Sequence, residues 1–101
     1  MTRLVVTADA EKDTDAILSY LEREAGSAVA EKFGRRFRAK IEDLLRWPES
    51  GAPRPNLGEA VRIAVVPPYI MFYEHDFRDD TLMLLRILHG SRRITSRLLR
   101  R

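Results

Sequence analysis

The sequence predicts an α+β domain, in which a small antiparallel sheet packs on an N-terminal pair of antiparallel helices. Two observations support this class. Apolar residues recur at helical spacing through residues 8–46, and short runs rich in β-branched and aromatic residues follow from residue 61 onward. The chain has 101 residues, of which 45% are hydrophobic, and this length suits a single domain spanning residues 1–101. The expected element order is β-α-α-β-β-β with a short C-terminal helix.

The first half of the chain is expected to hold one strand and both helices. Residues 3–7, RLVVT, have the composition of a strand, and Thr7 is suited to cap the helix that follows. Gly26 ends that helix, and Ser27 is expected to cap the next one after a connection of about three residues. The second helix ends at Trp47, because the residue before a proline is disfavoured in helical conformation. A connection this short predicts an antiparallel αα-hairpin. Its second helix carries one apolar stripe: Val29, Phe33, Phe37, Ile41, Leu44 and Leu45.

The second half of the chain is expected to form a three-stranded meander. A loop over residues 48–60 holds three prolines and two glycines, and its length makes it a candidate for contacts with a partner. The predicted strands are residues 61–66, 69–75 and 81–89. The last strand is apolar on both faces, so it is expected at the centre of the sheet with both faces covered. Residues 91–101 are expected to form the short helix.

Charge is distributed unevenly along the chain, whose formal net charge is +3. Residues 9–24 carry six acidic side chains against two bases, whereas residues 86–101 carry six arginines and no acid. The basic end therefore predicts an anionic partner, either nucleic acid or an acidic protein surface. No run of 18 apolar residues and no signal-peptide pattern is present, and cysteine is absent, so a reducing cytoplasm is the expected location.

Few residues carry recognisable catalytic chemistry. The two histidines, His75 and His89, lack the companions of a metal site, and no phosphate-binding glycine loop occurs, so neither metal nor cofactor is expected. A metal-free ribonuclease remains as a catalytic candidate, with His89 as base or acid and Arg62, Arg86 and Arg92 holding the phosphate. The structural alternative is that His89 ends a strand and bonds a backbone carbonyl, while Arg62 and Arg86 pair with Glu74 or Asp76.

Three other features have both a functional and a structural interpretation. Ser91 lies near His89, but its expected role is to cap the C-terminal helix rather than to act as a nucleophile. The tail arginines form either a binding surface or a solvated helix face. Arg54 lies between Pro53 and Pro55, which either place it for contact or make the loop a rigid connection.

Three stretches together resemble a known family. They are TADAEKDTDAILSYL, GAPRPNLGEAVRIAVVPPYIMFYEH and LLRILHGSRRI. They are similar to ParE, the toxin of the bacterial ParD/ParE toxin–antitoxin pair, within the ParE/RelE superfamily. The resemblance covers essentially the whole chain, and it implies a small antiparallel sheet on an αα-hairpin. Its most specific element is RILHGSRRI.

The superfamily implies two alternative activities. The RelE branch resembles ribosome-dependent messenger RNA endonucleases, and Arg62 and Arg86 sit where that branch keeps phosphate-holding arginines, with His89 near its acid/base end. No tyrosine follows Arg86 and no lysine follows Lys40, so half of that set is missing, whereas HGSRR is the ParE form. The resemblance therefore favours a cytoplasmic toxin that arrests growth by inhibiting DNA gyrase, of the kind associated with plasmid stabilization. A third alternative is a degenerate copy that only binds an antitoxin.

The favoured hypothesis, a gyrase-inhibiting toxin, implies a set of partners and contact residues. A ParD-like antitoxin would neutralise the toxin in a hetero-oligomer, through an acidic or amphipathic segment added to the fold as a helix or strand. The expected gyrase contacts are Arg92, Arg93 and Arg97, with Arg54 in the loop. This reading needs no catalytic residue, no cofactor, no metal, no membrane and no sequence-specific nucleic-acid binding by the chain.

Overall fold

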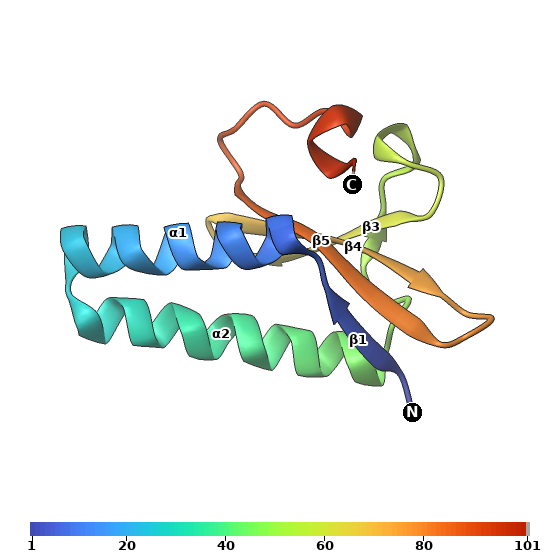
Figure 1. Ribbon diagram of the computed structural model, residues 1–101, viewed down its shortest axis with the longest axis horizontal. Coiled ribbons are helices and arrows are strands. Elements are labelled where there is room, and N and C mark those ends of the chain that lie inside the picture. Colours follow the sequence, from blue (N-terminus) through green and yellow to red (C-terminus); the bar gives the residue numbers. More distant parts are fainter. Residues whose placement is uncertain (101) are drawn as a thin grey trace.

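The computed structural model describes residues 1–100, so Arg101, the last of the tail arginines, lies outside the described residues. Two long helices precede most of the sheet, as the sequence predicts (Figure 1). The elements are β1 (Arg3–Val6), α1 (Ala8–Ala25), α2 (Ser27–Arg46), β2 (Ala52–Pro53), the 3-10 turn η1 (Pro55–Leu57), β3 (Val61–Val66), β4 (Tyr69–Asp76), β5 (Thr81–His89) and the 3-10 turn η2 (Ser96–Leu99).

The sheet has five strands in the order β1-β5-β4-β3-β2. Strands β3, β4 and β5 form the predicted antiparallel meander, and the two-residue β2 extends it at one edge. The first strand differs from an all-antiparallel sheet, because β1 pairs in parallel with β5 through residues 3–6 and 81–84. Thus β5 lies between β1 and β4, in the interior position that its apolar sequence indicates.

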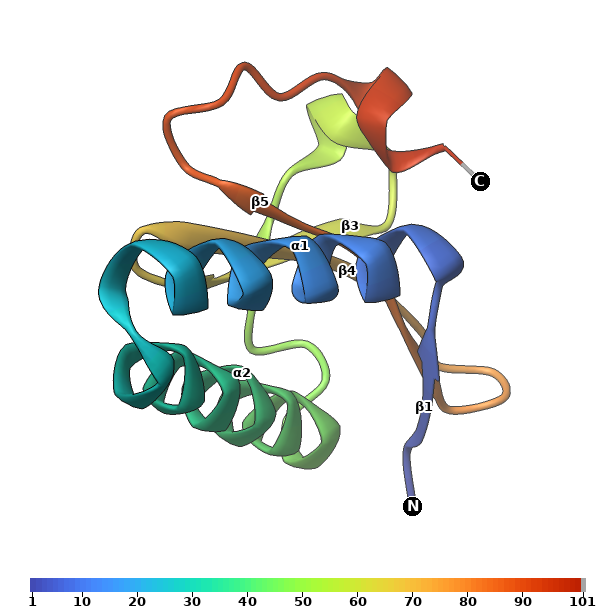
Figure 2. The same ribbon diagram turned by 60° about the vertical axis from the view of Figure 1, so that its left-hand side comes forward.

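Both faces of the sheet are covered (Figure 2). The helical hairpin packs on one face, where Phe37, Leu44, Met71 and Tyr73 belong to what we call the helix-face core. On the other face η1 and η2 approach each other, and Phe72, Leu85, Leu88 and Leu99 belong to the second-face core. The sequence indicated a covered second face without showing which segment covers it.

The helix ends are set by local chemistry. The Thr7 side chain accepts a hydrogen bond of 3.1 Å from the Ala10 amide, which confirms the predicted cap. The connection between the helices is Gly26 alone, with φ of 94°, so the expected three-residue link and the Ser27 cap are both wrong. Glycine tolerates this left-handed conformation, and Ser27 becomes the first residue of α2. None of the helices within residues 1–100 is long and apolar enough to cross a membrane.

The C-terminal segment is less helical than the sequence suggests. Regular structure is limited to η2, and residues 93–95 are irregular. Ile94 and Leu98 pack against the second-face core, and Leu99 is buried in it. The segment therefore crosses the sheet in a mostly irregular conformation. Its few apolar side chains pack on the second-face core rather than forming one face of a helix.

Candidate functional site

The three candidate ribonuclease residues do not converge. Arg62 faces Tyr73 across the sheet, and Tyr73 belongs to the helix-face core. Arg86 faces Phe72, which belongs to the second-face core. Since cross-strand partners share a face, Arg62 and Arg86 lie on opposite faces of the sheet. His89 pairs with Tyr69 of β4, whereas Arg62 pairs with Tyr73. Tyr69 and Tyr73 are four residues apart, which separates His89 from Arg62 by about 13 Å along β4.

Arg62 is occupied by the segment that follows α2. Its Nη1 donates to the backbone carbonyls of Glu49 at 3.0 Å and Gly51 at 2.8 Å, and its Nη2 lies 3.9 Å from the Glu49 carboxylate. The expected pairing with Glu74 or Asp76 is wrong, because the returning chain reaches the guanidinium instead. Arg62 thus anchors the start of the loop that leads into β2.

Tyr73 also binds the segment that follows α2. Its hydroxyl oxygen accepts a hydrogen bond of 2.9 Å from the Gly51 amide. Burial raises the pKa of Tyr73 above 10.0, even though the Gly51 bond and the charge of Arg62 act to lower it. The hydroxyl consequently stays protonated at neutral pH and serves as a structural anchor.

His75 forms a clamp that sequence reasoning did not identify. Its Nδ1 lies 3.2 Å from the Glu49 carboxylate and its Nε2 lies 2.9 Å from that of Asp80, so both ring nitrogens have acidic partners. Burial acts to lower the pKa of His75, but the hydrogen bonds and charges of Asp80 and Glu49 outweigh it and raise the pKa above 6.5. The available signal was the acidic stretch HDFRDD that begins at this histidine.

The His75 clamp predicts a pH-dependent contribution to stability. A pKa that is raised on folding adds stability that is fully present below about pH 6.5, the value in an unfolded chain, and is lost as the pH rises through the folded value. We therefore expect the melting temperature to fall as the pH is raised from 6 toward 8. The His75→Gln variant should lack this decline when both proteins are melted across that range. An identical slope in the two proteins would contradict the clamp.

Arg86 is the most enclosed of the candidate arginines. Its Nε and Nη2 donate to the two carboxylate oxygens of Asp13 at 2.7 and 2.9 Å, and its Nη1 donates to the Leu98 carbonyl at 2.8 Å. The side chains of Arg86 and Asp13 are only 16% and 12% exposed. The hydrogen bonds to Asp13 raise the pKa of Arg86. The structural alternative, in which Arg86 pairs with Glu74 or Asp76, is also wrong in its partner, because α1 brings Asp13 to the strand.

His89 and Ser91 form a local turn at the end of β5. The Ser91 amide donates to His89 Nδ1 at 3.0 Å, and the Ser91 hydroxyl lies 2.7 Å from the same nitrogen. A backbone N–H only donates, so Nδ1 is the acceptor in that bond. His89 ends its strand as expected, but the nitrogen accepts from a backbone amide rather than donating to a carbonyl. Ser91 does not cap η2, which begins five residues later at Ser96.

Three arginines of the C-terminal segment have side chains that face solvent. Arg92, Arg93 and Arg97 are exposed, and within residues 1–100 their side chains make no hydrogen bond or ion pair. Arg54 is exposed too, but its Nη1 donates to the carbonyl of neighbouring Pro53 at 2.8 Å. The structure brings the three tail arginines together on one docked segment and keeps Arg54 on the separate loop before η1.

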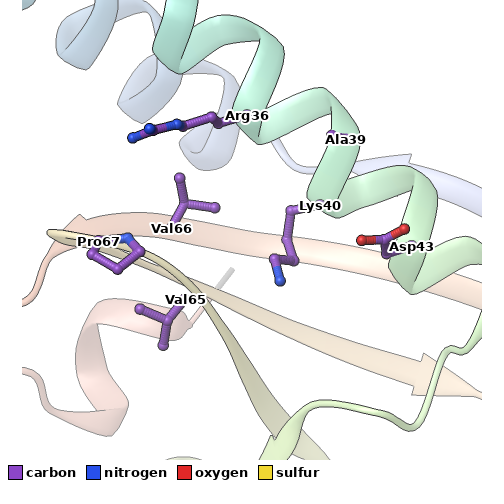
Figure 3. A pocket seen from close by; sticks show the side chains of 7 residues that line it. All are labelled: Arg36, Ala39, Lys40, Asp43, Val65, Val66 and Pro67. Carbon is purple, nitrogen blue, oxygen red and sulfur yellow. The ribbon is translucent and has the colours of Figure 1, made fainter.

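A groove with an apolar floor runs between α2 and β3 (Figure 3). It has a volume of about 460 Å³ and is lined by Arg36, Ala39, Lys40, Asp43, Val65, Val66 and Pro67. Strand β2 pairs only with Arg62 and Ile63, so in the described part of the chain no strand pairs with the outer edge of residues 64–66. The Val61 carbonyl accepts from Arg54 at this edge, and by alternation the backbone groups of Val65 also point outward.

The fold and these sites define a class: a small α+β protein with exposed cations on a docked tail and an open sheet edge beside a basic helix. Within residues 1–100 no cluster of three or more acidic, histidine or cysteine side chains is suited to hold a metal ion. Residues 4–94 match the family described as ParE toxin of type II toxin-antitoxin system, parDE. The chain belongs to this ParE toxin family.

The solved structures that are similar to this chain include two from toxin–antitoxin systems. One is a chain of the chromosomal ParDE TA system from P. aeruginosa, with a TM-score of 0.74 and 24% identity over 88% of this chain and 96% of that one. The other is a chain of the toxin–antitoxin complex RelBE2 from Mycobacterium tuberculosis, with a TM-score of 0.58 and 25% identity over 87% and 96%. At 24% identity, the likeness to the P. aeruginosa chain shows a shared fold alone. No curated protein is similar enough to this chain to serve as a relative.

Proposed function

We propose that this toxin arrests growth by binding DNA gyrase through its arginine tail, and that a ParD-type antitoxin neutralises it by occupying the groove between α2 and β3. One observation carries the choice of a binding mechanism. Arg62 and Arg86 bind internal partners on opposite faces of the sheet, whereas Arg92, Arg93 and Arg97 are exposed and have no side-chain partner within residues 1–100. Gyrase is proposed as the target because the chain belongs to the ParE family, whose resemblance implies gyrase inhibition.

The alternative, a messenger RNA endonuclease, needs a different arrangement. Such an enzyme requires an acid or base and several cations around one phosphate. His89 is separated from Arg62 along β4, and Arg86 could reach a phosphate only by leaving Asp13. Breaking this partly buried pair would leave the Asp13 carboxylate without its bidentate partner, which disfavours such a movement. The arrangement therefore favours binding over phosphodiester cleavage.

The groove has the shape and charge to bind an acidic antitoxin segment. An extended peptide can pair with the open edge at Val65, as in other cases of strand addition. Val65 is 45% exposed, and Arg36 and Lys40 lie on the α2 side of the groove. Figure 3 shows Val66 pointing toward the helix and Val65 toward the opposite side. An acidic segment with alternating apolar residues fits these features, and its binding should weaken with salt.

Expression in bacteria tests the target. Induction of the toxin should cause double-strand DNA breaks and SOS induction while transcripts remain intact, and co-expression of the antitoxin encoded beside it should restore growth. The His89→Gln variant should remain toxic, because no proton transfer is required of this residue. Cleaved transcripts with intact DNA, together with an inactive but folded His89→Gln protein, would establish the endonuclease instead.

The edge of β3 predicts a specific loss of antitoxin binding. Val65→Pro removes the outward N–H, and proline is tolerated at a free edge, so the toxin should remain folded. Losing one strand-pairing hydrogen bond and distorting its neighbours should weaken antitoxin binding about 10-fold, measured by calorimetry. The matched control is Val65→Thr, which keeps the N–H and the branched side chain. Equal affinities of the two variants would place the antitoxin elsewhere.

A further inference from the structure

A β-bulge places Arg86 where three separate segments meet. Phe72 faces Arg86 and Tyr73 faces Leu84, so Leu85 is an extra residue on β5. Beyond residue 84 the outer edge of β5 has no β1 partner. The start of α1 takes that place: the Thr7 hydroxyl donates to the Leu85 carbonyl at 2.9 Å, and the Asp13 carboxylate accepts from the Ile87 amide at 3.0 Å.

The same carboxylate orients the Arg86 guanidinium. Asp13 occupies Nε and Nη2 in a bidentate pair, which leaves Nη1 directed at the Leu98 carbonyl. Planar, two-point pairing of this type restricts the guanidinium to one orientation. Arg86 is therefore a rigid bracket between α1, β5 and η2, and its third contact lies within the C-terminal segment.

Apolar contacts also hold the C-terminal segment on the sheet. Its contributions to the second-face core are Ile94, Leu98 and Leu99. Its own backbone bonds after residue 93 are local, from the Leu98 amide to Thr95 and from the Arg100 amide to Arg97. The hydrogen bond from Arg86 Nη1 to the Leu98 carbonyl joins this segment to β5. Burial of three apolar side chains offsets only part of the entropy lost by ordering the segment.

We propose that Arg86, oriented by Asp13, is a positioning residue that holds the C-terminal segment docked and thereby presents Arg92, Arg93 and Arg97 in one arrangement. The docking role stands on the contacts above, and its consequence for toxicity rests on the proposed function of the tail. In this proposal Arg86 has a structural role, although its position resembles that of a phosphate-holding arginine in the RelE branch.

Amide hydrogen exchange on the full chain tests the bracket. Arg86→Lys keeps the charge but cannot hold both Asp13 oxygens and the Leu98 carbonyl in one plane. Asp13→Asn is a second, milder variant, because its amide oxygen still accepts from the Ile87 amide. In both variants the Leu98 and Arg100 amides should exchange about 10-fold faster, while the Met71 amide in β4 changes less. The control is Asp79→Asn, which removes the exposed contact to Arg3 and should alter neither region.

The outcomes separate the docking role from the proposed function. Faster exchange confined to the tail, with weakened growth arrest, supports both. Faster tail exchange with undiminished growth arrest supports the bracket and overturns the tail as the target contact. Unchanged tail exchange in both variants overturns the bracket, as does an equal increase at Leu98 and Met71, which would show that Arg86 only stabilises the whole fold.

Discussion

Replacing Arg92, Arg93 and Arg97 together by alanine is expected to abolish growth arrest while leaving the fold intact. The three side chains are exposed and make no contact that stabilises the chain within residues 1–100, so each substitution should change stability by at most about 0.5 kcal/mol. If each arginine makes one charge-assisted contact with the target, each loss weakens binding about 10-fold or more. The paired measurements are thermal melting and growth on induction.

The arginine variant needs a control for net charge. Arg23, Arg46 and Arg78 are exposed and lie outside the tail, so their triple alanine variant removes the same charge elsewhere. It should remain fully toxic. Truncation at Ser91 is a poorer test, because it uncovers the second-face core where Leu99 is buried. Full toxicity of the tail variant, with a normal melting temperature, would show that the active surface lies elsewhere.

Gly51→Ala is expected to destabilise the protein strongly. A Cβ at residue 51 would lie 2.6 Å from the Ile63 carbonyl oxygen and against the Tyr73 hydroxyl. The residue cannot move away without losing the Gly51 contacts to Tyr73 and Arg62. Overpacking of this kind costs about 1–3 kcal/mol, and each kcal/mol corresponds to about 4–8 °C in a domain of this size. We therefore expect the melting temperature to fall on the order of 10 °C.

Gly34→Ala is the matched substitution with the opposite expectation. Gly34 is buried within α2, but a Cβ there would meet Leu18 and Arg38 at ordinary distances of 4.0 and 3.6 Å. Alanine favours the helix by about 1 kcal/mol over glycine, so the melting temperature should rise. A Gly51→Ala variant that melts at the temperature of the unchanged protein would show that the segment between α2 and β2 is not clamped as described.

The elements of this protein follow from local sequence. The apolar periods of residues 8–46 and the three runs after residue 61 place the hairpin and the meander, and Thr7 caps its helix as its side chain dictates. Membership of the ParE family was evident from RILHGSRRI and its neighbours, and it agrees with the family match. Charge patterning likewise identified Arg92, Arg93 and Arg97, which the structure leaves exposed.

Tertiary structure alone decided how the charged residues are used. Arg86 and Asp13 are 73 residues apart in sequence, and Arg62 meets the chain 11 and 13 residues earlier, so no local pattern links them. The parallel position of β1, the extra residue at Leu85 and the chain that covers the second face arise from packing at long range. Periodicity reports which side chains are buried, because burial depends on residue type. It does not report which charged side chains form ion pairs. The strength of an ion pair depends on the distance between the two charges, and the folded backbone sets that distance.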